Sequence, residues 1–367
     1  MIDLPSHIDA FRRRLGKRLL ILGHHYQREE VIVHTDLRGD SFQLSAAAAE
    51  HAASGGGDCE TIVFCGVHFM AETADILANS AENLARRQGK RVNVLLPDLE
   101  AGCSMADMAT YQTVEQCWNK LSDIIDTNDI VPITYVNSTA ELKAFCGRHG
   151  GFACTSTNAQ AVLETALKEK HRVLFFPDQH LGRNTAFKMG IDESAMCCWD
   201  DSDDDATKWG GNSAEQILKS RIILWSGYCS VHQKFQPEDV DAIRKTYSGV
   251  RVIVHPECCR EVVEKADESG STSYILHRIS ESPSGSSWAV GTEARFVERL
   301  ARQNPDKTVV NLSAQPSYCD TMGLIDLPKL AAVLDSVESG ELKNVIRVDD
   351  QTAREVLRCL QRMLECR

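Results

Sequence analysis

Residues 250–258 read VRVIVHPEC, an apolar run that leads directly into a polar cluster. Two other stretches follow the same plan, LLILGHHYQ at residues 19–27 and PITYVNST at residues 132–139. Short apolar runs that alternate with helical patterns are typical of an α/β protein with parallel sheets. The three stretches therefore predict strands that carry polar side chains at their carboxyl ends.

Each of these stretches opens a longer pattern, and its order is the same three times. A hydroxyl cluster that leads into a helix comes next, then a middle strand, then a last strand that ends in a loop with one cysteine. The hydroxyl clusters are GDSFQLS (39–45), CTSTNA (154–159) and GSTS (270–273). The cysteine loops are PDLEAGCSM (97–105), SGYCSVH (226–232) and SAQPSYCDTM (313–322).

We interpret this order as an internal repeat of three similar α/β units with parallel sheets, arranged around a pseudo-threefold axis. The predicted bounds are 1–125, 126–247 and 248–321, followed by a helical tail at 322–367 that packs back on the first unit. The alternative is the strand-then-polar alternation that any α/β protein shows, but the matching cysteine in every unit favours a repeat. The predicted strands are 19–22, 61–64, 92–96, 131–136, 172–176, 221–225, 250–254, 288–290 and 308–312.

The second unit carries an acidic insertion near 190–215. It contains WDDSDDDATKWGGNS, and its acidic, glycine- and serine-rich character predicts an exposed loop. The insertion adds Cys197 and Cys198 and several aspartates, to which we assign no function.

Composition excludes several classes of protein. The 367 residues are 43% hydrophobic, and the net charge of −12 argues against nucleic-acid and anionic-membrane surfaces. No segment approaches the ~18 apolar residues of a membrane span, and no signal peptide is recognisable. We therefore expect a cytoplasmic protein whose 14 cysteines stay reduced.

In parallel α/β sheets, ligands bind just beyond the carboxyl ends of the strands. Polar residues two positions apart project the same way from an extended chain, so each such pair can face one ligand. The pairs at the three strand ends are His24 with Tyr26, Tyr135 with Asn137, and His255 with Glu257. A lone strand-end histidine is usually a hydrogen-bonded core residue, but the recurrence of the pairs favours a site. Histidine and glutamate there can act as general acid or base.

The hydroxyl clusters place side chains where helices are expected to begin, namely Ser41, Ser156, Ser271 and Thr272. Helix N-termini bind carboxylate and phosphate oxygens through free N–H groups. The alternative is a plain helix cap, which serine and threonine form without any ligand. Three equivalent positions favour anion binding.

The cysteines that follow the last strands are Cys103, Cys229 and Cys319. Adjacent pairs such as Cys197–Cys198 and Cys258–Cys259 are poorly spaced to hold one ion. Three thiolates on three loops suit a cubane [4Fe–4S] cluster with one iron left open, which would act as a Lewis acid on substrate. We expect His232 to lie near this cluster, whereas His68, His180 and Arg183 fit structural roles equally well.

The ordered motifs resemble those of the quinolinate synthase family. They are GHHYQ (23–27), GDSFQLS (39–45), PDLEAGCSMADM (97–108), YVNS (135–138), CTSTNA (154–159), PDQHLGRN (177–184), GYCSVH (227–232), HPEC (255–258) and GSTS (270–273). The resemblance implies three α/β domains around a central cluster. It also implies condensation of iminoaspartate with dihydroxyacetone phosphate to quinolinate, phosphate and water, in de novo NAD biosynthesis, with an L-aspartate oxidase as the expected supplier of iminoaspartate.

By this resemblance Cys103, Cys229 and Cys319 hold the cluster, although CDTM departs from the family's usual Cys–Pro–x–Met context. Substrate-contacting positions would be His24, Ser41, Tyr135, Asn137, Ser156, His255, Glu257 and Thr272. Glu257 is the expected proton shuttle, assisted by Tyr26, His24 and His255. The second histidine of GHHYQ stands where the family often has asparagine, a change that we expect to be tolerated.

Two other classes remain open at this point. Another [4Fe–4S] hydro-lyase acting on small hydroxy acids would share the cluster and the carboxylate-binding groups without needing a triose-phosphate site. A zinc-binding or redox-inert binding protein could be built on the same repeat. Visible absorbance after anaerobic purification separates an iron–sulfur protein from the last of these.

Overall fold

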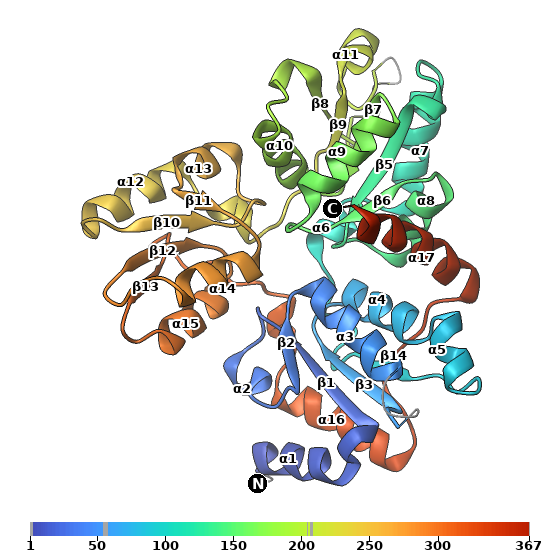
Figure 1. The fold of residues 1–367 in the computed structure, drawn as a ribbon, viewed down its shortest axis with the longest axis vertical. Coiled ribbons are helices and arrows are strands. Elements are labelled where there is room, and N and C mark those ends of the chain that lie inside the picture. Colours follow the sequence, from blue (N-terminus) through green and yellow to red (C-terminus); the bar gives the residue numbers. More distant parts are fainter. Residues whose placement is uncertain (1–2, 54–57, 204, 206–207, 367) are drawn as a thin grey trace. The chain divides into compact units, whose positions relative to one another are not determined.

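The computed structural model describes residues 3–53, 58–203, 205 and 208–366. It contains three parallel sheets, and helices cover both faces of each (Figure 1). The predicted α/β class with three parallel-sheet units is confirmed. The chain divides into two compact units: unit 1 comprises Met1–Cys103 and Tyr318–Ala353, and unit 2 comprises Ser104–Ser317 and Arg354–Arg367.

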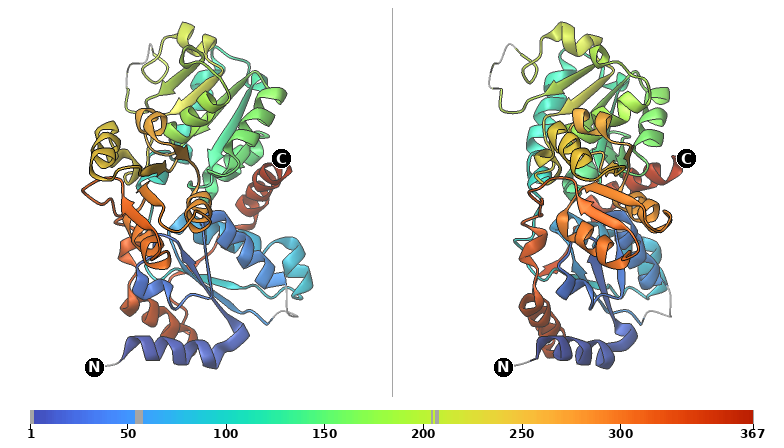
Figure 2. Two further views of the ribbon diagram at one scale, coloured as in Figure 1. Left: turned by 60° about the vertical axis from the view of Figure 1, so that its left-hand side comes forward. Right: turned by 90° about the vertical axis from the view of Figure 1, so that its left-hand side faces the viewer.

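Unit 1 is built on a five-stranded sheet in the order β14-β4-β3-β1-β2. The strands are β1 (Leu19–His24), β2 (Leu37–Gly39), β3 (Thr61–Cys65), β4 (Asn93–Leu95) and the antiparallel β14 (Val345–Ile346). Helices α3 (Ser41–Ala53), α4 (His68–Ala78) and α5 (Ala81–Arg86) lie on one face, and α1 (Leu4–Leu15), α2 (Glu29–Ile32) and α16 (Leu327–Ser339) on the other (Figure 1). Helix α16 runs beside α1 in both further views (Figure 2). The two helices are joined by His7 and Asp335, whose Nε2 and Oδ1 atoms lie 2.8 Å apart.

Unit 2 contains two sheets, and the first has the order β6-β5-β7-β9-β8. Its strands are β5 (Ile130–Tyr135), β6 (Phe152–Cys154), β7 (Arg172–Phe176), β8 (Met196–Trp199) and β9 (Ile222–Trp225). Helix α8 (Ala140–Arg148) packs on one face, and α9 (Ala159–Glu169) and α10 (Gln179–Lys188) pack on the other. All of β5 is buried, as expected for a strand covered on both faces.

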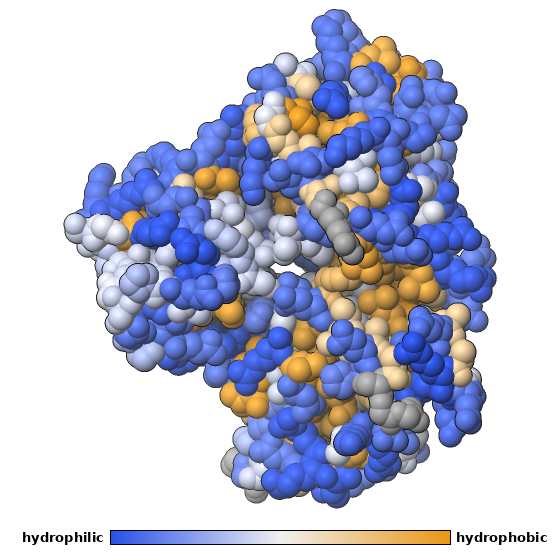
Figure 3. All heavy atoms as spheres, viewed as in Figure 1, coloured by the Kyte–Doolittle hydropathy of each residue, from blue (hydrophilic) through white to orange (hydrophobic). Residues whose placement is uncertain are grey.

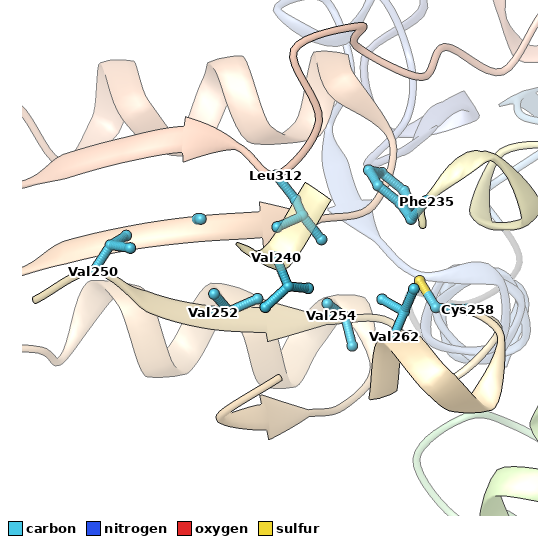
Figure 4. Close-up of a cluster of buried hydrophobic side chains, with 9 residues drawn as sticks. Phe235, Val240, Val250, Val252, Val254, Cys258, Val262 and Leu312 are labelled. Carbon is cyan, nitrogen blue, oxygen red and sulfur yellow. The ribbon is translucent and has the colours of Figure 1, made fainter. Parts of the chain in front are cut away.

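The second sheet of unit 2 has the order β11-β10-β12-β13. Its strands are β10 (Arg251–Val254), β11 (Glu268–Ser269), β12 (Ser287–Gly291) and β13 (Thr308–Asn311), and its helices are α12 (Pro237–Thr246), α13 (Arg260–Lys265), α14 (Thr272–Ser280) and α15 (Ala294–Gln303). Val252 and Val254 of β10 pack with Val240 and Val262 in a buried apolar cluster that also contains Cys258 (Figure 4). This core lies directly beneath the loop that begins at His255.

The three sheets share one topology. In each, the four repeat strands, numbered along the chain, lie in the order 2-1-3-4: β2-β1-β3-β4, β6-β5-β7-β9 and β11-β10-β12-β13. Every strand predicted from the sequence is present, but the short second strand of each repeat was not predicted. Within the acidic insertion, residues 196–199 form the edge strand β8 beside β9, which was not predicted either.

The C-terminal tail is shared between the two units. Residues of α16 and β14 complete the first sheet, whereas α17 (Asp350–Glu365) contacts the second. Glu355 of α17 forms an ion pair with Arg148, and Arg362 forms one with Glu169.

Hydrophilic residues cover much of the visible surface of both units (Figure 3). Among the described residues, no helix is both long enough and apolar enough to cross a membrane.

Candidate active site

A buried carboxylate lies just past the end of β10. His255 follows the strand directly, and its backbone N–H donates to Gly291 O of β12 at 3.0 Å. The chain then turns, with Cys258 N donating to His255 O at 3.0 Å. This turn holds His255 and Glu257 in the interior, with exposures of 3% and 2%.

Glu257 lies among two imidazoles and a phenol. His232 Nδ1 is 2.7 Å from Glu257 Oε2, and His255 Nδ1 is 3.9 Å from the same oxygen. The His232 and His255 rings stack at 4.5 Å between centroids. His232 Nε2 lies 3.0 Å from Thr292 Oγ1, and Tyr135 at the end of β5 hydrogen-bonds to Glu257. Strand ends of both sheets of unit 2 therefore meet at one carboxylate.

The surroundings of this cluster shift the pKa values of Glu257 and His255. Burial alone would raise the pKa of Glu257, but the two imidazoles and the hydrogen bonds from His232 and Tyr135 lower it to about 2. Burial lowers the pKa of His255 to about 3, against the opposing attraction of Glu257. Glu257 is therefore an ionised carboxylate at neutral pH, held in the interior beside His255.

A second buried carboxyl, Asp178, was not singled out from the sequence. Its Oδ1 caps α10 by accepting from His180 N at 2.7 Å and Leu181 N at 3.3 Å. Burial, and then the nearby charge of Glu257, raises the pKa of Asp178 well above its ordinary value. The motif PDQHLGRN was its only signal in the sequence, because its neighbour Glu257 is distant along the chain.

Cys229 adds a thiol to the same place. Ligand atoms of Cys229, His232 and Glu257 lie within 4.8 Å of one another, a set that could hold a metal ion. Contacts within unit 2 also bring neighbours of the other two loop cysteines to this loop. Ser104, next to Cys103 in the chain, lies with its Oγ 3.4 Å from Ser230 Oγ. Ser317, two residues before Cys319, donates to Val231 O at 2.9 Å.

The cysteines differ in their suitability as ligands. Metal binding needs the thiolate, and burial disfavours that form. Burial raises the pKa of Cys65 to about 12 and that of other buried thiols well above its usual value: Cys117, Cys146, Cys154 and Cys258. The three loop cysteines are only partly buried. They follow β4, β9 and β13, the equivalent last strands of the three repeats.

Unit 1 presents its predicted residues at the carboxyl end of its own sheet. His24 is the last residue of β1, and its ring meets that of Tyr26 edge-on at 4.7 Å. Ser41 is the buried first residue of α3. Arg28 donates to Gly323 O at 2.7 and 3.0 Å, which joins the loop after β1 to the loop that carries Cys319.

The hydroxyl clusters of unit 2 border a cavity of about 580 Å³ between α9 and α10 on one side and α13 and α14 on the other. Ser156 and Ser271 line this cavity. Thr272 is the first residue of α14, but Ser156 precedes α9 by three positions, because a turn from Thr155 to Asn158 intervenes. Asn137 lies in the loop after β5 and is partly buried.

Repeated parallel sheets with a buried carboxylate–imidazole cluster beside a cysteine loop are typical of an α/β enzyme, with thiol, imidazole and carboxylate groups that could bind a metal. Known proteins agree with this class. The family model described as quinolinate synthetase A protein (NadA) matches residues 6–365. A quinolinate synthase of Rhodopirellula baltica is 55% identical over 98% of this chain and 90% of its own length.

Two further relatives carry the same name. Quinolinate synthases of Bacillus velezensis and of a Nocardioides species are each 48% identical over 99% of this chain, and over 93% and 91% of their own lengths. The chain belongs to the quinolinate synthase family. It is therefore an enzyme, and the family supports this activity rather than that of a different hydro-lyase.

Proposed function

We propose that this chain condenses iminoaspartate with dihydroxyacetone phosphate to give quinolinate, phosphate and water, as a step of de novo NAD biosynthesis in the cytoplasm. The observation that carries the proposal is the buried cluster of Glu257, His232, His255 and Tyr135 beside Cys229. Carbon–carbon bond formation, ring closure and dehydration all need proton transfers beside a bound carboxylate. An ionised, buried carboxylate beside two imidazoles provides groups that can take part in such transfers.

We propose Cys103, Cys229 and Cys319 as the ligands of a [4Fe–4S] cluster. Support comes from their partial burial, from their equivalent positions after β4, β9 and β13, and from the contacts of Ser104 and Ser317 with the Cys229 loop. A cluster with three cysteine ligands supplies one open iron as a Lewis acid when bound. The shared 2-1-3-4 strand order further supports three repeats, near 1–125, 126–247 and 248–321, around a pseudo-threefold axis.

We propose the remaining roles as the resemblance to the family implies them. Glu257 moves protons, with His255, Tyr26 and His24 assisting. Tyr135, Asn137 and Thr272 join them in contacting substrate. Ser41 and Ser156 offer hydroxyls for carboxylate or phosphate oxygens, and Ser156 does so from the wall of the unit 2 cavity. An enzyme that oxidises L-aspartate would supply the unstable imine.

An anaerobic assay tests this proposal directly. The reconstituted protein is mixed with iminoaspartate and dihydroxyacetone phosphate, and quinolinate is quantified by chromatography. We expect quinolinate and phosphate in equal amounts, both dependent on the triose phosphate. Dehydration of a small hydroxy acid without any quinolinate would instead favour the competing hydro-lyase.

A further inference from the structure

The turn that carries Glu257 depends on one side chain from another repeat. The carbonyls of Pro256 and Cys258 flank Glu257, and both accept from Asn184 Nδ2, at 2.9 and 2.8 Å. A carboxamide nitrogen carries two N–H donors, so each carbonyl receives its own hydrogen. Asn184 lies on α10 of the second repeat, whereas the turn belongs to the third.

Helix α10, which carries Asn184, is itself held in place by hydrogen bonds. Asp178 caps its first turn through His180 N and Leu181 N. His180 Nε2 lies 2.7 Å from Gln233 Oε1, which ties the helix to the residue after His232. Asn184 thus projects from a helix that is held at two places. Asp178 caps its start, and His180 connects it to Gln233, the residue after His232.

We propose that Asn184 is a positioning residue for the reaction, which acts by fixing the turn that aims Glu257 at His232 and Tyr135. Pro256 and Asn184 both border the unit 2 cavity, so water would reach the Pro256 carbonyl if the amide were lost, whereas the buried Cys258 carbonyl would lose its partner. The Pro256–Glu257 peptide would then be held by the Cys258 N–His255 O hydrogen bond and by the longer contact from Glu257 N to His255 Nδ1, at 3.4 Å, and could rotate. Displacement of a reacting group by ~1 Å can cost about 100-fold in rate.

This inference rests on the proposed role of Glu257, and its test separates the two. Asn184→Leu keeps the number of side-chain heavy atoms and their branching but removes both donors. We expect kcat to fall by about 10- to 100-fold while KM changes by less than about threefold. Wild-type protein without quinolinate formation would contradict the proposed function. An active wild type with an equally active Asn184→Leu variant would contradict the positioning role alone.

A double-variant cycle shows whether Asn184 acts through Glu257. In a Glu257→Gln background, Asn184→Leu should lower kcat by less than about twofold, because the group that it positions is already disabled. Effects that multiply independently would overturn the proposal. If Asn184→Leu does not fold, Asn184→Ser replaces it in both backgrounds. A hydroxyl has one donor, so kcat should lie between that of wild type and that expected when both hydrogen bonds of Asn184 are lost. An unchanged kcat would overturn the proposal.

Asn212 provides a matched control in the acidic insertion. Its Nδ2 lies 2.7 Å from Cys198 O, 2.9 Å from Trp209 O and 2.8 Å from Gly210 O, so it is also an amide that gathers backbone carbonyls. Asn212→Leu should lower the thermal midpoint but leave kcat of the folded protein unchanged. An equal loss of kcat in both variants would mean that the effect of Asn184 is general destabilisation.

Discussion

Glu257 combines two properties that rarely coexist, complete burial and an ionised state at neutral pH. Its charge is sustained by His232 and Tyr135, with His255 stacked behind His232. Each of these partners comes from a different strand end or loop, so the charge state of one residue depends on the packing of two sheets.

Glu257→Gln tests the proton-transfer role at this residue. The amide keeps the size of the side chain and part of its hydrogen bonding but cannot carry a proton. We expect kcat to fall by about 10²–10⁴-fold with substrate binding retained. Steady-state kinetics and ligand titration measure the two effects separately, and retention of more than roughly half of the turnover would transfer the role to His255 or Tyr26.

Glu268 makes stability depend on pH away from the active site. Arg278 donates to it at 2.7 and 2.8 Å, Tyr274 donates at 2.7 Å, and these contacts lower the pKa of Glu268 to about 2. Because the unfolded value is about 4.3, the stabilisation is complete above that pH and is lost as the pH falls toward 2. Glu268→Gln should therefore cost about 1–2 kcal/mol in urea unfolding at pH 7. The difference from wild type should shrink at pH 3, and an equal loss at both pH values would exclude the charge as its cause.

Residue-scale prediction from the sequence relies on local signals. His255 and Glu257 were proposed as site residues because they are two positions apart after a recognisable strand, and both lie in the buried cluster. Asn184 and Asp178 were missed because their partners are backbone carbonyls or a carboxylate more than 70 residues away. A backbone carbonyl has the same chemistry at every position, so the residue types do not reveal which carbonyl a side chain will contact.

Among elements, the long buried strands were predictable, whereas the edge strands other than β13 were not. β1 and β5 are six-residue runs with every residue buried. β2, β6 and β11 have three, three and two residues, and pairing with a neighbour rather than composition defines them. β8 was hidden because its pair of cysteines adjoins an acidic run that indicates a loop.

Helix α17 offers a test of packing at the scale of an element. A Cβ added at Gly147 in α8 would lie 1.9 Å from Glu355 O of α17, a backbone atom that cannot move alone. Gly147→Ala should therefore push the helices apart and destabilise unit 2 by about 1–3 kcal/mol. Leu364→Ala, on the exposed side of α17, should change stability by less than about 0.5 kcal/mol. Chemical denaturation of both variants gives the comparison, and equal stability of Gly147→Ala and wild type would mean that α17 is not closely packed there.

At the scale of the whole chain, the proposed cluster draws its ligands from all three repeats. Single replacement of Cys103, Cys229 or Cys319 by serine should abolish or cripple cluster assembly, because one iron then loses the thiolate that attaches it to the protein. Cys59→Ser and Cys366→Ser serve as controls and should retain the cluster. Iron and sulfide analysis after anaerobic reconstitution provides the measurement. Full iron content in Cys319→Ser would remove that residue from the ligand set.

The division of the chain into two units bears on how it folds during synthesis. Both sheets of unit 2 lie wholly between residues 104 and 317, whereas the first sheet receives α16 and β14 only from residues 318–353. A nascent chain leaves the ribosome N-terminus first, and its domains fold as units. The two sheets of unit 2 can therefore form before the first sheet is complete, although α17 joins unit 2 only at the end. The opening hundred residues must wait, with one sheet edge and one helical face uncovered, until translation is nearly over, and this is the interval in which we expect a chaperone to be needed.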